Sequence, residues 1–383
     1  MSANPFQVEP GPVLSKRSLN RALLERQMLI QRKQMSALEA IEHLVGLQAQ
    51  APNPPYIGLW ARLADFQQAE LSKLIQSRQA VRIALMRSTI HLVSSRDCLA
   101  LRPLLQPVLE RGLRGSYGKH LTAIDQEALS AAGRALVEER PRTFQEISAL
   151  LAEDERWRDL DPSAIANIVR THIPLVQVPP RGLWGESGQA AHTSAETWLG
   201  TGLSVDCSVD SSIETIIERY LAAFGPATVQ DMQAWSGLTK LNGVISLMRP
   251  RLRIFRDEHG KEVFDLPDAP LPDPDAPISA KFMAEFDNAL LSHADRSRII
   301  SEDDRKRVFT INGIIRSTFL IDGFVQGMWK ITKERDTATL VIDPFRPLSK
   351  KDKTELAAEG VNLLTFAAGE FAVHNIRINE PLS

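Results

Sequence analysis

The 383-residue chain contains only two cysteines, Cys98 and Cys207, and its eight histidines show no HxxxH or HExxH spacing. Two thiols exclude a disulfide framework and a cysteine-based metal site. No apolar run is long enough to cross a bilayer, and the first twenty residues contain no apolar core of a secretory signal. We therefore expect a cytoplasmic protein with no membrane partner and no metal.

The sequence motifs of several large enzyme classes are also missing. There is no Walker loop, no GxGxxG that opens a helix and no GxSxG elbow, and no lysine stands in an apolar stretch suited to Schiff-base chemistry. These absences argue against nucleotide, dinucleotide and serine-hydrolase chemistry. We expect no cofactor.

The net charge is only −2, which by itself argues against a nucleic-acid-binding protein, but the charge is unevenly distributed. Residues 1–120 hold 16 Lys and Arg against 8 Asp and Glu, a net charge of +8. The remaining residues hold 29 and 39, a net charge of −10. A basic first third can steer a polyanion to one face of the molecule. Chance clustering of solvated arginines is the alternative.

An α+β fold is indicated by an order of elements that occurs three times. In residues 211–266, three helical patterns end at Gly225, Gly237 and Pro250, and strand, turn and strand follow. Three helices and a β-hairpin make a winged helix, which is a helix-turn-helix unit with a wing. A middle segment has the same order, with a capping box at Thr143 and Glu146. The N-terminal segment has it with an additional helix.

The predicted organisation is therefore a tandem array of winged helices in a concave arrangement, with a small C-terminal antiparallel β-sheet and helix domain. The C-terminal part has turn signals at Asn312-Gly313 and Asp322-Gly323 and a helical pattern near 350–367. The predicted segments are 14–120, 121–200 and 208–266 for the three winged helices, 265–279 for a stiff Pro/Asp-rich connector, and 280–383 for the last domain.

Two glutamines stand where an apolar helical pattern breaks, in "GLQAQAPNPPY". On a helix, Gln48 and Gln50 would be roughly 200° apart, but on extended backbone they share a side. Two amides directed to one point can hold a water through their carbonyl oxygens. The structural alternative is that they satisfy loose backbone groups at a helix end.

Further candidate DNA contacts lie in three segments. If "LMRSTIHLV" is one strand, Arg87, Thr89 and His91 lie on one face, where they suit a phosphate or a base edge. The segment "PPRGLWGESG" places Arg181 and Trp184 at a wing that could enter a groove, although wing aromatics also pack on neighbours. The segment 285–299 holds a polar cluster, in which Asp295 and Arg296 could simply pair; its members are Asp287, Asn288, His293, Asp295, Arg296 and Arg298.

Taken together, these motifs resemble the AlkZ-like winged-helix DNA glycosylases, which excise N7-alkylated guanine and unhook interstrand crosslinks. The resemblance rests on "GLQAQAPNPPYIGLWARL", "LMRSTIHLV", "LVQVPPRGLWGESG", "YLAAFGPATVQDMQAWSGL", "LPDAPLPDPDAP" and "EFDNALLSHADRSRI", which occur in the family's order over nearly the whole chain. It implies that Gln48 and Gln50 are the catalytic pair. A sister branch with broader substrates has Asp at the second position, so Gln at both positions resembles the crosslink-unhooking branch.

The resemblance implies a monofunctional glycosylase whose natural partner is double-stranded DNA with alkylated or crosslinked guanine. A guanine alkylated at N7 is cationic, so it leaves as a neutral base without protonation, and two amides can then suffice to place a water near C1′. We expect Arg82, Arg87 and His91 to hold the DNA backbone beside the pair, so that Arg87→Ala weakens DNA binding and its salt dependence. We expect a monomer associated with the nucleoid.

Two other functions remain compatible with the residues alone. A winged-helix transcription regulator would bind one DNA sequence tightly without releasing a base. A non-catalytic protein that binds a lesion or a drug would recognise modified DNA without turnover. Paired glutamines at a helix break favour the enzyme, because a regulator has no use for them.

Overall fold

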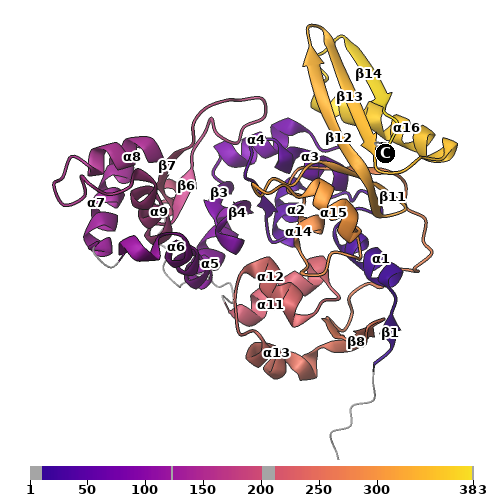
Figure 1. Cartoon of the computed structure of the whole chain (residues 1–383), viewed down its shortest axis with the longest axis horizontal. Helices are drawn as coiled ribbons and strands as arrows, with labels where there is room; N and C mark the ends of the chain where they lie inside the picture. Colours follow the sequence, from indigo (N-terminus) through magenta and orange to yellow (C-terminus); the bar gives the residue numbers. More distant parts are fainter. Residues whose placement is uncertain (1–10, 122–123, 201–211, 382–383) are drawn as a thin grey trace, which may run out of the picture.

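The computed structural model describes residues 11–121, 124–200 and 212–381, and their fold is a mixed α+β fold with three sheets (Figure 1). The predicted start of the third segment, at 208, and Cys207 lie outside the described residues. The N-terminal elements are β1 (Val13–Leu14), α1 (Lys16–Arg26), α2 (Ala37–His43), β2 (Leu47–Gln48), α3 (Pro54–Arg62), α4 (Gln68–Gln76), β3 (Ala80–Ala84), the 3-10 turn η1 (Met86–Ser88), β4 (Ile90–Ser94), α5 (Ser95–Leu104) and α6 (Gln106–Leu121).

Both middle segments contain the predicted three helices followed by two strands, and the first also contains a short strand after its first helix and a further helix at its end. The first contains α7 (Gln126–Glu139), β5 (Arg142–Thr143), α8 (Phe144–Leu151), α9 (Pro162–His172), β6 (Leu175–Gln177), β7 (Ala191–Ser194) and α10 (Ala195–Leu199). The second contains α11 (Ile213–Phe224), α12 (Val229–Ser236), α13 (Asn242–Met248), η2 (Arg249–Arg251), β8 (Arg253–Asp257) and β9 (Glu262–Asp265). The predicted capping box begins α8, since Thr143 and Glu146 bond reciprocally to each other's backbone.

The C-terminal part differs from the prediction in its sheet. Its elements are β10 (Lys281–Met283), α14 (Asn288–Leu291), α15 (Glu302–Val308), β11 (Thr318–Ile321), β12 (Phe324–Glu334), β13 (Thr337–Pro344), α16 (Lys350–Ala367) and β14 (Val373–Ile378). The turn at Asp322-Gly323 joins β11 to β12 as predicted, whereas Asn312-Gly313 turns a loop closed by a single bridge. The sheet is not wholly antiparallel, because α16 crosses over and returns the chain as β14, parallel to β13.

One six-stranded sheet joins the N-terminal segment to the first middle segment. Its order is β2-β4-β3-β6-β7-β5, and Arg82 on β3 pairs with Gln177 on β6. Helix α6 packs on α9, so it belongs spatially with the middle segment although it lies before the boundary predicted at residue 120. The helices α6–α9 enclose their own small core, around Leu129, Ile147 and Ile165, separate from the large core that unites the rest of the molecule.

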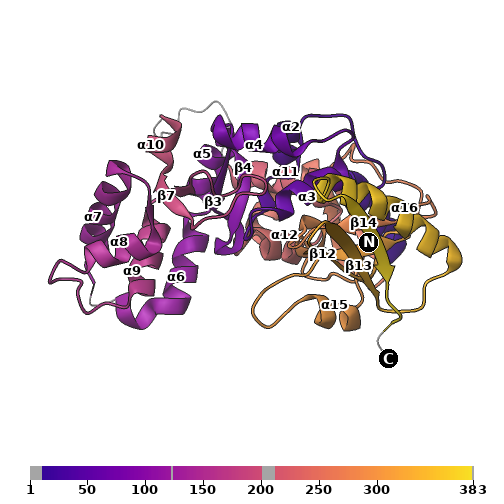
Figure 2. The same ribbon diagram turned by 90° about the horizontal axis from the view of Figure 1, so that it is seen from above.

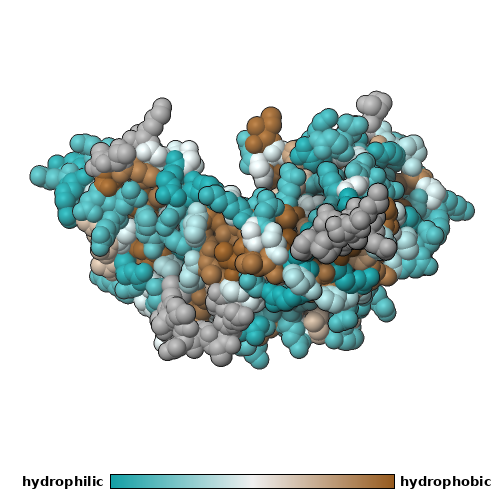
Figure 3. All heavy atoms as spheres, turned by 90° about the horizontal axis from the view of Figure 1, so that it is seen from below, coloured by the Kyte–Doolittle hydropathy of each residue, from teal (hydrophilic) through white to brown (hydrophobic). Residues whose placement is uncertain are grey.

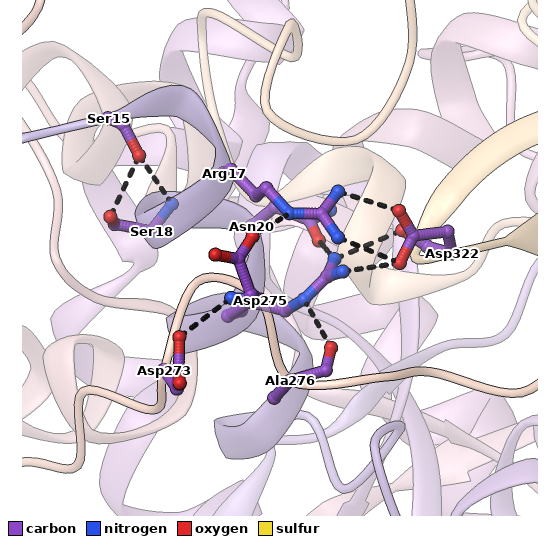
Figure 4. Close-up of polar contacts among 9 residues, drawn as sticks. Ser15, Arg17, Ser18, Asn20, Asp273, Asp275, Ala276 and Asp322 are labelled. Atoms are coloured by element: carbon purple, nitrogen blue, oxygen red, sulfur yellow. Dashed lines mark hydrogen bonds and ion pairs between the residues drawn. The ribbon is translucent and has the colours of Figure 1, made fainter.

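Helix α1 ties the N-terminal segment to the C-terminal part (Figure 4). Arg17 donates to the carboxylate of Asp322, in the turn between β11 and β12, at 2.6 Å. The buried Arg21 donates to the same carboxylate and also to the carbonyl of Ala276, in the Pro/Asp-rich connector, at 3.0 Å. The connector is thus fixed along α1 by side-chain bonds.

The molecule is elongated, with α6–α9 at one end and the C-terminal sheet with α16 at the other (Figure 2). Seen from below, the surface is hollowed between the lobe of α6–α9 and the rest of the molecule (Figure 3). Strands β3 and β4 of the shared sheet lie between the lobe of α6–α9 and the C-terminal sheet (Figure 2).

Candidate active site

The two glutamines follow a sharp turn out of α2. The helix ends at His43, earlier than the apolar pattern of the sequence suggests, and Val45 and Gly46 take positive φ values of 54° and 89°. A Cβ on Gly46 would lie 2.9 Å from the carbonyl oxygen of Leu92, so this position requires glycine. Gln48 ends strand β2 with its side chain buried, and Gln50 lies two residues further on, exposed.

The carbonyl oxygens of both side-chain amides accept hydrogen bonds. The oxygen of Gln48 accepts from Nη2 of Arg87 at 2.7 Å, and that of Gln50 accepts from the backbone N–H of Ile90 at 3.1 Å. Neither side-chain NH₂ group donates to another of the described residues. Gln50 therefore also satisfies a backbone group, as the structural alternative expects, and each amide oxygen keeps one lone pair.

Arg87 is placed by a break in the chain rather than by a strand. The segment 85–93 is not one strand: β3 ends at Ala84, η1 follows, and Arg87 and Ser88 have φ values of 55° and 59°. The prediction of one polar face along this segment is therefore wrong, because the chain reverses there. Besides Gln48, the Arg87 guanidinium donates to the carbonyl of Trp235 at 2.5 Å. Burial, helped by the nearby Arg296, lowers the pKa of Arg87 to about 10.

A second contact to the glutamine strand comes from Asn288, at the start of α14. Its side-chain NH₂ donates to the carbonyl of Gly46 at 2.7 Å, and its oxygen accepts from the N–H of Gln48 at 3.3 Å. The preceding Asp287 caps α14 and forms a fully buried bidentate ion pair with Arg62, with both bonds at 2.8 Å. The sequence placed both residues in a polar cluster but gave Asn288 no role.

The other candidates near β3 and β4 are mostly buried. Arg82 donates to the carbonyl of Ala49 at 2.6 Å and to the side chain of Gln177 at 3.1 Å, and only 1% of it is exposed. The hydroxyl of Thr89 closes the η1 turn by donating to the carbonyl of Met86. His91 lies opposite Gln48 in the ladder, and burial, together with Arg87, lowers its pKa to about 3. These three side chains support the turn and loop beside the glutamines.

Arg181, Trp184 and Arg296 have separate surroundings. Arg181 lies in the loop between β6 and β7, with its guanidinium bonded to the carbonyl of Gly188. The Trp184 ring does not reach a groove, because it packs on Tyr56 and Phe366 with centroids 5.1 and 5.7 Å away. Arg296 does not pair with Asp295, since it donates to the carbonyl of Leu290 and lies over the Phe309 ring.

The described residues contain no group of three or more His, Cys, Asp or Glu side chains arranged to hold a metal ion. Within the same residues, no helix is both long and apolar enough to cross a membrane. The candidate site therefore consists of neutral amides supported by arginines.

This fold and site define an α+β protein with a hollowed face and paired amides on a sheet edge. The profile of the family "DNA glycosylase AlkZ-like" matches residues 41–366, and the chain belongs to that family. A curated relative, the interstrand DNA cross-link repair glycosylase of Streptomyces sahachiroi, is 23% identical over 344 residues, which cover 84% of this chain and 88% of the relative. The solved structure of Streptomyces sahachiroi DNA glycosylase AlkZ superposes with a TM-score of 0.79 at 20% identity, over 96% of this chain and 100% of that one.

Proposed function

We propose that the protein is a monofunctional DNA glycosylase that hydrolyses the N-glycosidic bond of cationic N7-alkylated guanine, including guanine in interstrand crosslinks. Membership of the AlkZ-like family supports the reaction class. The curated relative is an interstrand DNA cross-link repair glycosylase, which supports crosslinked DNA as a substrate. The observation that carries the proposal is that Gln48 ends the edge strand β2 and Gln50 follows two residues later, with the oxygen of each amide bonded to a donor.

Two neutral amides suit a substrate that brings its own activation. N7 alkylation makes guanine a cation, so breaking the bond to C1′ releases a neutral base and needs no proton from the protein. Water adds its oxygen to C1′ and gives up one proton to solvent. The protein needs to position that water and to complement the cationic sugar that develops. An amide oxygen is a weak base but a strong dipole, so it can do both.

The hydrogen bonds of Gln48 and Gln50 refine this role. One lone pair on each oxygen is already occupied, by Arg87 and by the Ile90 N–H. The remaining lone pair on each oxygen can accept from a water held between the two side chains. Each donor restrains its amide, Gln48 more than the exposed Gln50, and in this proposal both oxygens face one water. Arg87 acts here as a positioning residue.

The wider architecture supports binding of a duplex. In this proposal the three helix-and-hairpin segments are winged helices that form one concave wall, and a monomer is sufficient because one chain supplies all of them. A crosslinked base cannot be turned fully out of the helix, so an open face suits it better than a deep hole. Arg181 and Arg296 would contribute charge to this interface.

Base release from a duplex with one N7-methylguanine tests the proposal, scored as strand cleavage at the abasic site after alkali. The wild type should release the base, and Gln48→Ala and Gln50→Ala should each lose roughly 100-fold or more in rate, as for removal of one preorganised polar group. Gln67→Ala, at an exposed glutamine before α4, is the matched control. Efficient release of uracil, a neutral base, would contradict the mechanism. No release with retained binding would favour a regulator or a lesion-binding protein.

A further inference from the structure

A polar pocket opens beside Gln50, between the N-terminal segment and the lobe of α6–α9. Its volume is about 620 Å³. Its walls come from the turn before β4, the first turn of α8, the end of α9 and the loop between β6 and β7. Its lining includes Gln50, Phe144, Gln145, Arg170, Arg181 and His192.

The charge of this pocket is positive. Two arginines line it and no carboxylate does, although Asp and Glu outnumber Lys and Arg in the chain. Arg170 donates to the carbonyl of Ser88, and Arg181 to that of Gly188, so neither guanidinium is neutralised by an acid there. The Nε atoms of both arginines are buried without a hydrogen-bond partner among the described residues. Burial lowers the pKa of Arg170, but an arginine stays protonated at neutral pH.

The first turn of α8 adds backbone donors to the same pocket. Thr143 and Glu146 close the capping box, while the N–H groups of Phe144 and Gln145 precede the first intrahelical bond and have no intrahelical acceptor. Donors of this kind, together with the helix dipole, favour an anion.

An independent observation at this pocket is the side chain of His192. Only 3% of this residue is exposed, and its ring stacks on Phe144 with centroids 4.1 Å apart. Neither ring nitrogen has a hydrogen bond of good geometry within the described part of the chain, although the backbone of Arg142, opposite His192 in the ladder, interacts with the ring. A buried imidazole normally bonds through at least one nitrogen, so an unpartnered one lining a pocket indicates a missing polar ligand.

We propose that this pocket binds a phosphate group of the DNA backbone next to the damaged nucleotide. The occupant is an anion, because the pocket offers two guanidinium groups and backbone N–H donors and would repel the cationic base. Gln50 lines the same pocket, and a nucleotide carries its phosphate on the sugar that contains C1′. A phosphate held here would therefore set the distance of C1′ from the two amides. This inference depends on the proposed function only in identifying the neighbouring nucleotide as the damaged one.

The first test measures binding of an undamaged duplex at several salt concentrations, so its result does not depend on catalysis. Arg170→Gln and Arg181→Gln should each weaken binding and make the slope of log affinity against log salt shallower by about 0.9, the value for one lost phosphate contact. Arg156→Gln, at an exposed arginine between α8 and α9, should leave the slope unchanged. Arg170→Lys, which keeps the charge, should restore most of the slope if the first variant is folded. Unchanged slopes in both glutamine variants would overturn the proposal.

The second test locates the phosphate. A set of duplexes, each with one uncharged methylphosphonate at a different position around an N7-methylguanine, is bound to the wild type and to Arg181→Gln. One position beside the lesion should weaken wild-type binding and have little further effect on the variant, since the same contact is already lost. A flat profile with shallower salt slopes would overturn the placement next to the damaged nucleotide. If the wild type released no base while both binding tests gave the expected results, the proposed function would be refuted. The phosphate site would still be supported.

Discussion

The two glutamines of the site are held in different ways. Gln48 is 7% exposed, and three contacts fix it: its strand pairing opposite the buried His91, the guanidinium of Arg87 and the side chain of Asn288. Gln50 is exposed, and a single backbone N–H holds its side chain. The first is a fixed amide in the protein interior, whereas the second is an adjustable amide at the rim of the phosphate pocket.

This difference assigns different tasks to two identical side chains. A buried amide bonded to a guanidinium is strongly polarised and cannot rotate, so it suits a role in defining where the water lies. In the proposed reaction, an exposed amide can follow the sugar as the duplex binds. Variants of the residues that support Gln48 should therefore change the rate of the chemical step. Variants of the residues near Gln50 should instead change DNA binding.

Among the variants that test this difference between Gln48 and Gln50, Arg87→Ala should have the largest effect. The variant removes a charged donor from Gln48, a bond worth about 1.5–3 kcal/mol, so the single-turnover rate should fall roughly 10- to 100-fold. The measurement is single-turnover release of N7-methylguanine at saturating enzyme, beside the salt dependence of duplex binding. Arg87→Lys should recover part of the rate, because it keeps one donor.

Arg96→Gln is the control for loss of a cation, because Arg96 is exposed on α5 and pairs with Glu42. The salt slope also separates positioning from DNA contact. The guanidinium of Arg87 is bonded to Gln48 and to Trp235, so we expect an unchanged slope in Arg87→Ala. A shallower slope with an unchanged rate would show that Arg87 contacts a phosphate, as the sequence alone suggests.

A smaller effect is expected from Asn288→Ala. The variant leaves the carbonyl of Gly46 and the N–H of Gln48 without their side-chain partner in a buried place, which should cost about 1–3 kcal/mol of unfolding free energy. Urea denaturation measures this loss. The rate of base release should fall by less than roughly tenfold, because Arg87 still holds the amide of Gln48.

Asn362→Ala, at an exposed asparagine of α16, is the matched control for both measurements. We expect Asn288 to hold the backbone of the Gln48 strand and Arg87 to hold the side chain of Gln48. An equal rate loss in Asn288→Ala and Arg87→Ala would contradict this distinction. Full stability with a large rate loss would instead place Asn288 in contact with the DNA.

The sequence predicts local features of this molecule well and its site only in part. The capping box at Thr143, the turn at Asp322-Gly323 and the helix over 350–367 depend on neighbouring residues, and all three are present. A single strand over 85–93, the condition for a shared face of Arg87, Thr89 and His91, does not form, because Arg87 and Ser88 adopt left-handed backbone that neither residue type signals and β4 begins only at Ile90.

The supporting contacts of the glutamines are tertiary, which explains why pattern reasoning missed them. Arg87 is 39 residues from Gln48, and Asn288 is 240 residues away. Only the packing of α14 against the turn after α2 brings the latter pair together. The Asp-Asn pair before α14 does signal a capped helix start, but it does not identify which strand the second side chain reaches.

The smallest effect is expected in the pH dependence of stability, through His91 beside Gln48 and His192 at the pocket. Burial lowers the pKa of His91, on the Gln48 side, to about 3 and that of His192, at the pocket, to about 4. An unfolded histidine has a pKa near 6.5, so below that pH the unfolded chain takes up protons that the folded protein does not. Stability should therefore be complete above about pH 6.5 and fall as the pH decreases toward 4. Thermal denaturation between pH 7 and 4.5 measures this fall.

His91→Gln and His192→Gln should each flatten that decline, since each removes one group whose protonation favours unfolding. His293, buried with a pKa of about 3 away from both glutamines, should keep part of it in either variant. Adding duplex DNA should flatten the pH dependence of the wild type but not of His192→Gln, because a bound phosphate favours the protonated ring and raises its lowered pKa. If DNA changed the pH dependence of both proteins equally, His192 would not contact the bound phosphate. Burial alone would then explain its lowered pKa.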